Sequence, residues 1–475
     1  MRDALFQFSG QRIDNCLPVK FRRWFGLVIA IIDVFLFGGI HYGFNSLIHV
    51  YKSVGLFAYN CTEEGCMYND SMFGVVFTVW MVSQMVLIVF AGIMMDTVGL
   101  RVLKLVAVGM YCTGCLMFGF TTATTVPLFY AAGVLVALGS ICSLICNHQV
   151  SSMFPQFRGL CISLLSGAYD SSTVIAYVIS LTYLLFPFKW SFIILAVGSV
   201  IVGGFVALFI LTRKCGDMGK FSSHKRRGEA LCEETSIESS TQVDIHSEVS
   251  SVLDERFPSL KSCILSLPYM MINIWFTFGL FRFSFYLSHL TKHINGMFSD
   301  DQPLADHLLQ TSSAFFMSSF LLSPITGLVI DFSLQRARTN IKNMLTTKRD
   351  SVSPDNLYYA LIVGLVPGQY IMASFAVLLS LMMYIDNHIA CYAGFVFLVV
   401  VRSFLFSCFI SFLLSAFPVR YFGTLNGISS AVSGLLSLMQ NLFITTSRST
   451  DNIVTLILSC VIFITPTVFL VKSKK

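Results

Sequence analysis

The sequence predicts an all-α membrane protein with twelve transmembrane helices arranged in two six-helix halves. Of its 475 residues, 55% are hydrophobic and only 12% are charged, which is too little polar surface to cover a soluble globule. Twelve apolar stretches are each about as long as the roughly 20 residues that a helix needs to cross the hydrocarbon core. A polar segment separates the first six stretches from the last six.

Charged residues or loops with Pro, Asn and Asp bound most of the expected spans. Residues 1–23 have no apolar core of their own, so we expect a cytoplasmic N-terminus without a cleaved signal peptide. Segment 213–262 turns from basic to acidic and serine-rich, which predicts a disordered cytoplasmic linker. The N-terminal half is then 24–212, the C-terminal half 263–471 and the cytoplasmic tail 472–475. The expected spans are 24–50, 72–95, 102–122, 127–148, 160–183, 190–212, 263–289, 308–330, 358–384, 390–415, 423–446 and 452–471.

The distribution of lysine and arginine predicts the orientation in the membrane. Of 31 such residues, 25 fall on the side of the N-terminus, and the opposite side has only Lys52, Lys189, Lys292 and Arg448. Because cytoplasmic loops are the basic ones, both termini are expected in the cytoplasm. The net charge of +6 is explained by this topology, so we expect no nucleic-acid partner.

The outer loop after the first span contains residues typical of an oxidising compartment. Cys61 and Cys66 are a candidate disulfide, and Asn60 and Asn69 each begin an Asn-x-Ser/Thr sequence, which makes them glycosylation candidates. Together these features predict a glycoprotein of the plasma membrane.

A turn motif follows the second span, and a weaker copy follows the eighth. Its residues are Gly92, Asp96, Gly99 and Arg101, with Asp331 in the second copy, which lacks the last glycine. Glycines allow a tight reversal, and the charged residues can complement helix ends. The pattern resembles the major facilitator superfamily. The resemblance implies the major facilitator fold and a cytoplasmic gate formed by these residues.

Several further stretches resemble solute carrier family 43. They are Gly167-Ala-Tyr-Asp170-Ser-Ser, Arg402-Ser-Phe-Leu-Phe-Ser, Phe422-Gly-Thr-Leu-Asn-Gly427 and the first span from Asp33. The L-type amino acid transporters of that family have a small residue where this chain has Asp170, whereas the nucleobase-transporting branch has an aspartate. The resemblance therefore implies nucleobase transport more than amino acid transport.

Asp170 is an acid within an apolar span, about ten residues from its cytoplasmic end. Ser163, Ser166, Thr173 and Tyr177 follow at steps of three and four, which predicts one polar stripe. A carboxylate facing lipid at this depth would cost several kcal/mol, so Asp170 should face protein, water or substrate. We interpret Asp170 and Ser166 as substrate-binding candidates. A structural acid bonded to another helix is the alternative.

Other spans supply further candidates. Arg402 lies at comparable depth in the tenth span and is a candidate charge partner of Asp170, while Arg282 is expected to extend to the outer interface. In the first span, Gly38, Gly39 and Gly43 should loosen the helix around His41, Tyr42 and Asn45. The remaining binding candidates are Tyr42, Asn45, Ser143 and Asn147. His148 is expected to bond a loop rather than a metal ion.

The sequence indicates a transporter of small organic solutes that works by alternating access. A purine base is planar and rich in donors and acceptors, whereas an amino acid needs groups of both charges. Uniport of purine nucleobases is the main hypothesis, and sodium-independent transport of large neutral amino acids is the alternative. A sensor or partner protein without flux, or a channel, stays open. The sequence has no nucleotide-binding loop, no set of four metal ligands and no nucleophile elbow. We therefore expect no enzyme activity, metal site or cofactor.

Overall fold

In the computed structural model, residues 19–62, 65–68, 70–213, 245–298, 301–347, 353–439 and 448–473 are described. Contacts divide the chain into two compact units. The first comprises residues 1–154 and 165–221, and the second comprises 155–164 and 222–475. The boundary at 221/222 falls inside the predicted linker.

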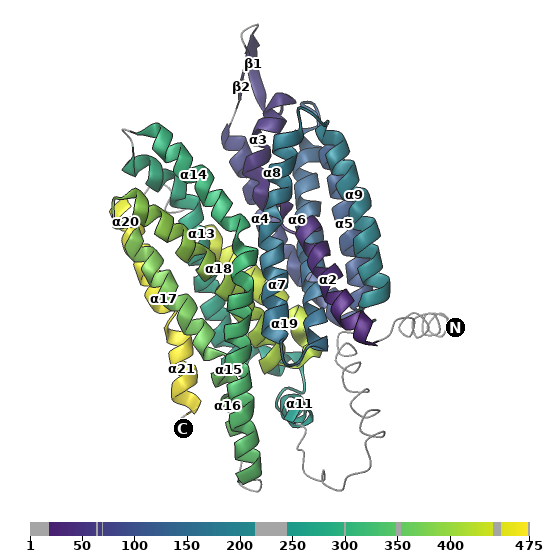
Figure 1. The fold of residues 1–475 in the computed structure, drawn as a ribbon, viewed down its shortest axis with the longest axis vertical. Coiled ribbons are helices and arrows are strands. Elements are labelled where there is room, and N and C mark those ends of the chain that lie inside the picture. Colours follow the sequence, from purple (N-terminus) through teal and green to yellow (C-terminus); the bar gives the residue numbers. More distant parts are fainter. Residues whose placement is uncertain are drawn as a thin grey trace, which may run out of the picture. The chain divides into compact units, whose positions relative to one another are not determined.

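The first unit consists mainly of long helices. Helices α5, α6 and α9 pack side by side (Figure 1). The elements are α2 (Val19–Phe37), η1 (Ile40–Gly43), α3 (Phe44–Ser53), β1 (Ala58–Thr62), β2 (Gly65–Tyr68), α4 (Asp70–Thr97), α5 (Leu100–Gly119), α6 (Val126–His148), η2 (Gln149–Met153), α7 (Arg158–Ser171), α8 (Thr173–Thr182), α9 (Phe188–Phe205) and η3 (Val206–Ile210). The first turns of α7 belong to the second unit.

The second unit is also helical. Helix α18 packs against α17 and α15. The elements are α11 (Ile245–Arg256), α12 (Leu260–Ile264), α13 (Leu267–Met297), α14 (Gln302–Met317), α15 (Ser319–Thr347), α16 (Pro354–Val363), α17 (Val366–Met382), α18 (His388–Ala416), η5 (Val419–Tyr421), α19 (Phe422–Ser437), α20 (Arg448–Val461) and α21 (Ile464–Ser473).

Ten stretches of the described residues are long and apolar enough to cross a membrane. Each corresponds to one of the expected spans. Two expected spans are missing from this set. Within 308–330, α14 ends at Met317 and α15 begins at Ser319, and several side chains of this stretch lie outside the described part. Within 423–446, α19 ends at Ser437, and residues 440–447 lie outside the described part. The count of twelve therefore stays a prediction.

The core of the first unit is an aromatic cluster. The Phe44 and Phe129 rings lie 4.7 Å and 5.3 Å from Trp80, and both pairs meet edge to face, the arrangement that aromatic quadrupoles favour. The Trp80 indole donates a hydrogen bond to the Tyr130 carbonyl at 3.1 Å. Gly133 is required beside this ring, because a Cβ there would overlap it. The cluster joins the first, second and fourth spans.

The outer loop forms a two-stranded hairpin. Strands β1 and β2 are antiparallel, with Ala58 opposite Tyr68 and Thr62 opposite Gly65. The backbone therefore places Cys61 on one strand and Cys66 on the other. Of the predictions in this loop, Asn69 lies outside the described residues. For Asn60, Cys61 and Cys66 only the backbone is described, so the disulfide and the glycosylation stay predictions.

The end of the predicted linker is ordered, which corrects the expectation of disorder over 213–262. Residues 245–256 form α11, and Leu253 and Phe257 are buried. The Phe257 ring lies 5.7 Å from Tyr358 and 5.1 Å from Phe417. This apolar contact orders the segment, although its composition is polar, because the burial is provided by other helices. Residues 214–244 lie outside the described part.

Candidate functional site

The first span is interrupted near its middle, whereas the fifth continues as a helix through a one-residue turn at Ser172. Helix α2 ends at Phe37 and continues as a short 3₁₀ turn, η1, before α3 begins. Helix α7 ends at Ser171, directly after Asp170, and α8 begins at Thr173. The loosening expected around Gly38, Gly39 and Gly43 is confirmed. Interrupted helices at mid-membrane expose backbone groups that commonly form transporter sites.

Glycine allows the interruption of the first span to pack closely against the fifth span. A Cβ on Gly39 would lie 2.7 Å from the Tyr169 carbonyl oxygen, and a Cβ on Gly43 would lie 2.8 Å from that of Thr173. Real side chains do not approach backbone so closely, so larger residues would push η1 away from α7 and α8. The glycines therefore hold the polar ends of these helices together.

A buried chain of hydrogen bonds connects four spans at this point. His41 Nε2 donates to Gln84 Oε1 at 2.9 Å, because an amide oxygen can only accept. Gln84 Nε2 donates to the Tyr169 hydroxyl at 3.2 Å, and that hydroxyl lies 3.4 Å from Ser140 Oγ. All four residues are buried. Gln84 was missed by the sequence analysis, although a lone amide inside an apolar span is a signal of function.

Aromatic rings surround the same region. The Tyr42 ring lies 4.5 Å from the His41 ring and 5.9 Å from Tyr169. Tyr42 is half-buried, so part of its ring is accessible. Rings in this arrangement suit a flat ligand. For Asn45, the structure describes only the backbone, in α3.

Asp170 lies in the last turn of α7 with 7% of its surface exposed. Its carbonyl accepts a hydrogen bond from Thr173 Oγ1 at 3.2 Å, which caps the end of α7. Ser166, one turn earlier, bonds His148 Nε2 at 3.2 Å. Tyr177 departs from the predicted stripe, since 43% of it is exposed.

Ser143 and Asn147 lie together in a buried polar group around Asp33, and their predicted contact with substrate stays a prediction. Both bond Asp33: Ser143 Oγ donates to Oδ2 at 3.3 Å, and Asn147 Nδ2 donates at 2.6 Å. Lys104 forms an ion pair with the same carboxylate and also donates to Ser143. Asp33 and Lys104 are buried. Neither was predicted as a site residue, and Lys104 was counted with the cytoplasmic basic residues.

In the second unit, Arg402 lies on α18 and is 5% exposed. Its guanidinium stands 5.0 Å from the centre of the Phe283 ring and 5.9 Å from Phe406. These distances are typical of cation–π contacts. The adjacent Ser403 Oγ lies 2.9 Å from Thr326 Oγ1. Arg402 and Asp170 belong to different units, so their pairing stays a prediction.

Arg282 corrects the expectation that this side chain extends to the interface. The residue is fully buried in α13. Its Nε donates to Ser380 Oγ at 3.1 Å and to Ser459 Oγ at 3.2 Å. Hydroxyls on α17 and α20 therefore hold the guanidinium inside the helix bundle.

The turn motif of the first unit contacts the end of the sixth span. Gly99 has a φ of +123°, and a Cβ would overlap the Arg213 carbonyl oxygen. Arg101 donates to the carbonyls of Ala207 at 3.1 Å and Leu211 at 2.9 Å. A cation at a helix C-terminus is favourable. Gly92 is buried and Asp96 half-buried in the last turns of α4.

The second copy of the motif forms hydrogen bonds with the start of α7, within the second unit. Asp331 accepts hydrogen bonds from the backbone N–H of Gly159 at 2.7 Å and of Leu160 at 2.8 Å. Arg338 Nη1 donates to the Pro155 carbonyl at 2.7 Å. An anion at a helix N-terminus is favourable because the first N–H groups have no partner in the helix.

The family is established by a sequence profile. That of the Major Facilitator Superfamily matches residues 24–440, and the chain belongs to this superfamily. The protein is a multi-pass membrane transporter.

Two relatives are named as transporters of the two substrate classes considered above, nucleobases and amino acids. The chain is 24% identical over 453 residues to equilibrative nucleobase transporter 1 of Bos taurus, with 87% of each chain covered. It is 22% identical over 501 residues to large neutral amino acids transporter small subunit 3 of Homo sapiens, covering 88% of this chain and 87% of the other. The resemblance stated from the sequence is confirmed.

Solved structures show the same fold. The proton:xylose symporter XylE, bound to 6-bromo-6-deoxy-D-glucose, matches with a TM-score of 0.59 at 12% identity, over 95% of each chain. A bacterial homologue of the iron transporter ferroportin, in an outward-facing state, matches with a TM-score of 0.59 at 11% identity, over 97% of this chain and 100% of the other.

Proposed function

We propose that this protein is a uniporter of purine nucleobases that works by alternating access. The observation that carries the proposal is the close packing of the interruption in the first span against the fifth span at Tyr169. Asp170 follows Tyr169 directly, and the Tyr169 ring lies 5.9 Å from that of Tyr42. A carboxylate, amide and hydroxyl groups, and aromatic rings together match a planar base with ring N–H groups and acceptors.

Transport of large neutral amino acids is the second candidate, supported by the relative of that name and by Arg402. In that case Asp170 would hold the ammonium group of the substrate and Arg402 its carboxylate. Nucleobases are preferred because the relative named as a nucleobase transporter is the more identical of the two, and because Asp170 is typical of that branch.

The proposal includes twelve transmembrane helices, with both termini in the cytoplasm and the protein in the plasma membrane. Gly92, Asp96, Gly99, Arg101 and Asp331 would form the cytoplasmic gate. Their observed contacts with helix ends support a role in holding one conformation, because breaking them would release the helices that rock during transport.

Purified protein in proteoliposomes tests the mechanism. We expect saturable uptake of labelled adenine that is accelerated by unlabelled adenine inside and is unchanged when proton and sodium gradients are collapsed. Asp170→Asn should lower this uptake at least about tenfold, the loss expected for one substrate hydrogen bond to a charged group. Asp254→Asn, on the exposed surface of α11, is the matched control. Uptake that requires a gradient would refute uniport, and full uptake by Asp170→Asn would remove Asp170 from the site.

A further inference from the structure

Gln84 bonds two aromatic side chains of the candidate site at the same time. It lies on α4 and is fully buried. Its Oε1 accepts a hydrogen bond from His41 Nε2 at 2.9 Å, and its Nε2 donates to the Tyr169 hydroxyl at 3.2 Å. An amide oxygen only accepts and an amide nitrogen only donates, so one side chain supplies both roles. An apolar residue of similar length at this position could bond neither neighbour.

The directions of these hydrogen bonds follow from their partners. Because Gln84 Nε2 donates to it, the Tyr169 hydroxyl is the acceptor of that bond, and its own proton points elsewhere. Ser140 Oγ lies 3.4 Å from this hydroxyl and donates to the Ala137 carbonyl at 2.9 Å. A lone pair of the serine therefore remains for the Tyr169 proton. The chain of bonds that passes through Gln84 thus restrains the orientation of the His41 ring and of the Tyr169 side chain.

Both of these rings contact Tyr42. The centre of the Tyr42 ring lies 4.5 Å from that of His41 and 5.9 Å from that of Tyr169, and the last two are 6.4 Å apart. His41 and Tyr169 are buried, whereas Tyr42 is half-buried. Tyr42 is therefore the ring of this group with surface for a ligand, and its position depends on the two buried rings against which it packs.

We infer that Gln84 is a positioning residue for the transported solute. It orients His41 and Tyr169 and so fixes the Tyr42 ring on which a planar base stacks; the inference rests on the proposed transport of nucleobases. The interaction between aromatic rings depends on their offset and angle, so a Tyr42 ring without fixed neighbours binds a base less tightly. An amide that only joined the spans would change the stability of the fold and leave the affinity for the solute as it is.

The uptake kinetics of Gln84→Leu separate these two roles. Labelled adenine uptake is measured in proteoliposomes per molecule of reconstituted protein, with Tm measured in parallel. We expect KM to rise about 5- to 100-fold, the range of one base–aromatic stacking contact, while Vmax changes less than about twofold. The matched control is Gln149→Leu, which removes another fully buried amide of the first unit, one that makes no hydrogen bond in the described part of the chain, and should keep the wild-type KM. An unchanged KM in Gln84→Leu, with only Vmax or Tm lowered, would overturn the inference.

A double variant shows whether Gln84 acts through Tyr169. Tyr169→Phe keeps the ring and removes the hydroxyl, and should raise KM about 2- to 10-fold, the worth of one hydrogen bond. Because both changes break the same chain of bonds, Gln84→Leu/Tyr169→Phe should have a KM within about twofold of that of Gln84→Leu. Single effects that multiply in the double variant would contradict the inference.

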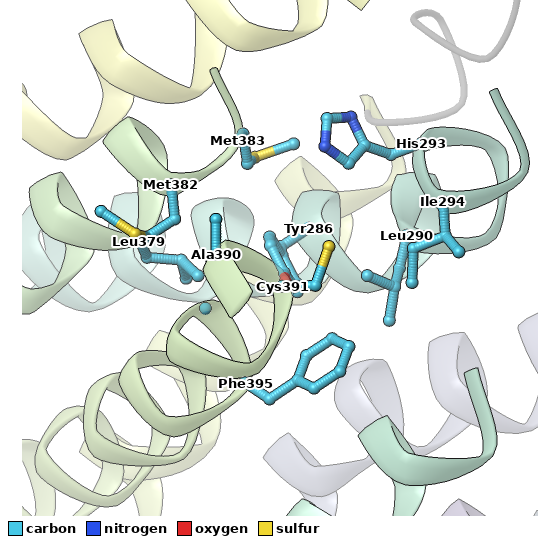
Figure 2. A pocket seen from close by; sticks show the side chains of 11 residues that line it. Tyr286, Leu290, His293, Ile294, Leu379, Met382, Met383, Ala390, Cys391 and Phe395 are labelled. Carbon is cyan, nitrogen blue, oxygen red and sulfur yellow. The ribbon is translucent and has the colours of Figure 1, made fainter. Parts of the chain in front are cut away.

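Tyr286→Phe is the matched control for the tyrosine variant and should keep the wild-type KM. Tyr286 and Tyr169 are both 4% exposed, and Tyr286 belongs to the second unit, where Figure 2 shows it beside Cys391 in a pocket lined mainly by apolar side chains. A rise in KM in this control as large as in Tyr169→Phe would mean that the loss of any buried tyrosine hydroxyl lowers affinity, which would contradict the specific role of the chain.

Leucine uptake keeps this inference separate from the proposed function. If the wild type carries leucine instead of adenine, the nucleobase proposal fails, and the same comparison of KM with leucine decides the role of Gln84; uptake of neither would overturn both. If Gln84→Leu does not fold, Gln84→Asn carries the test. Its shorter side chain keeps the amide but reaches only one of the two neighbours, so KM should rise about 2- to 10-fold. A wild-type KM in Gln84→Asn would then overturn the inference.

Discussion

Replacing Asp33 by Asn should destabilise the first unit strongly, because it removes the counter-ion of a fully buried ammonium group. Lys104 is 0% exposed, and its charge is paired with Asp33. Removing one partner of a buried ion pair costs about 3–5 kcal/mol. At about 2–4 °C per kcal/mol for a unit of this size, we expect a fall in Tm of about 6–20 °C. Buried cysteines such as Cys115, Cys142 and Cys146 allow unfolding to be followed with a thiol-reactive dye.

The double variant decides whether the pair is responsible. Lys104→Met keeps the length of the side chain and leaves Asp33 bonded to Asn147 and Ser143. The double variant Asp33→Asn/Lys104→Met has no buried charge left without a partner. Its loss of unfolding free energy should therefore be smaller than the sum of the two single losses by at least about 2 kcal/mol. Strictly additive losses, or single losses in Tm below about 3 °C, would refute the reasoning.

Three further changes test other contacts. Gly99→Ala should destabilise by about 1–3 kcal/mol in thermal unfolding, since φ is +123° and the Cβ overlaps a carbonyl, whereas Gly109→Ala, with open space around it, should be neutral or stabilising. Asp331→Asn weakens two bonds to the N-terminus of α7 and should increase proteolysis in the 154–157 loop that precedes this helix; unchanged cleavage would contradict this role. Tyr169→Phe leaves a buried Gln84 N–H unpaired and should lower Tm by about 2–12 °C, given a cost of about 1–3 kcal/mol; no fall would mean that water replaces the hydroxyl.

The spans could be predicted from the sequence because each is a local property of about 20 residues. The interruption of the first span was also predictable, since three glycines fall within six residues. The fifth span was predicted as one helix, and the backbone stays helical through the turn at Ser172. Its packing against η1 was not predictable, because it is a contact between distant parts of the chain.

The buried ion pair could not be predicted, because it depends on a distance between residues that are 71 positions apart. Lys104 lies near the start of its helix, where a basic residue is expected from topology alone. Ser143 and Asn147 both bond Asp33, which the sequence did not show, and their role in substrate binding stays a prediction. For Arg282 the expectation of an interfacial side chain was wrong. Serines on α17 and α20 bind the guanidinium, so the side chain stays inside the helix bundle and does not extend to the membrane interface.

Uptake of labelled adenine and labelled leucine, measured side by side in cells expressing this chain, tests the central proposal most directly. We predict saturable adenine uptake above that of mock-transfected cells, without leucine uptake, and its loss in Asp170→Asn. Uptake of leucine alone would contradict the nucleobase assignment and would indicate that Asp170 holds an ammonium group.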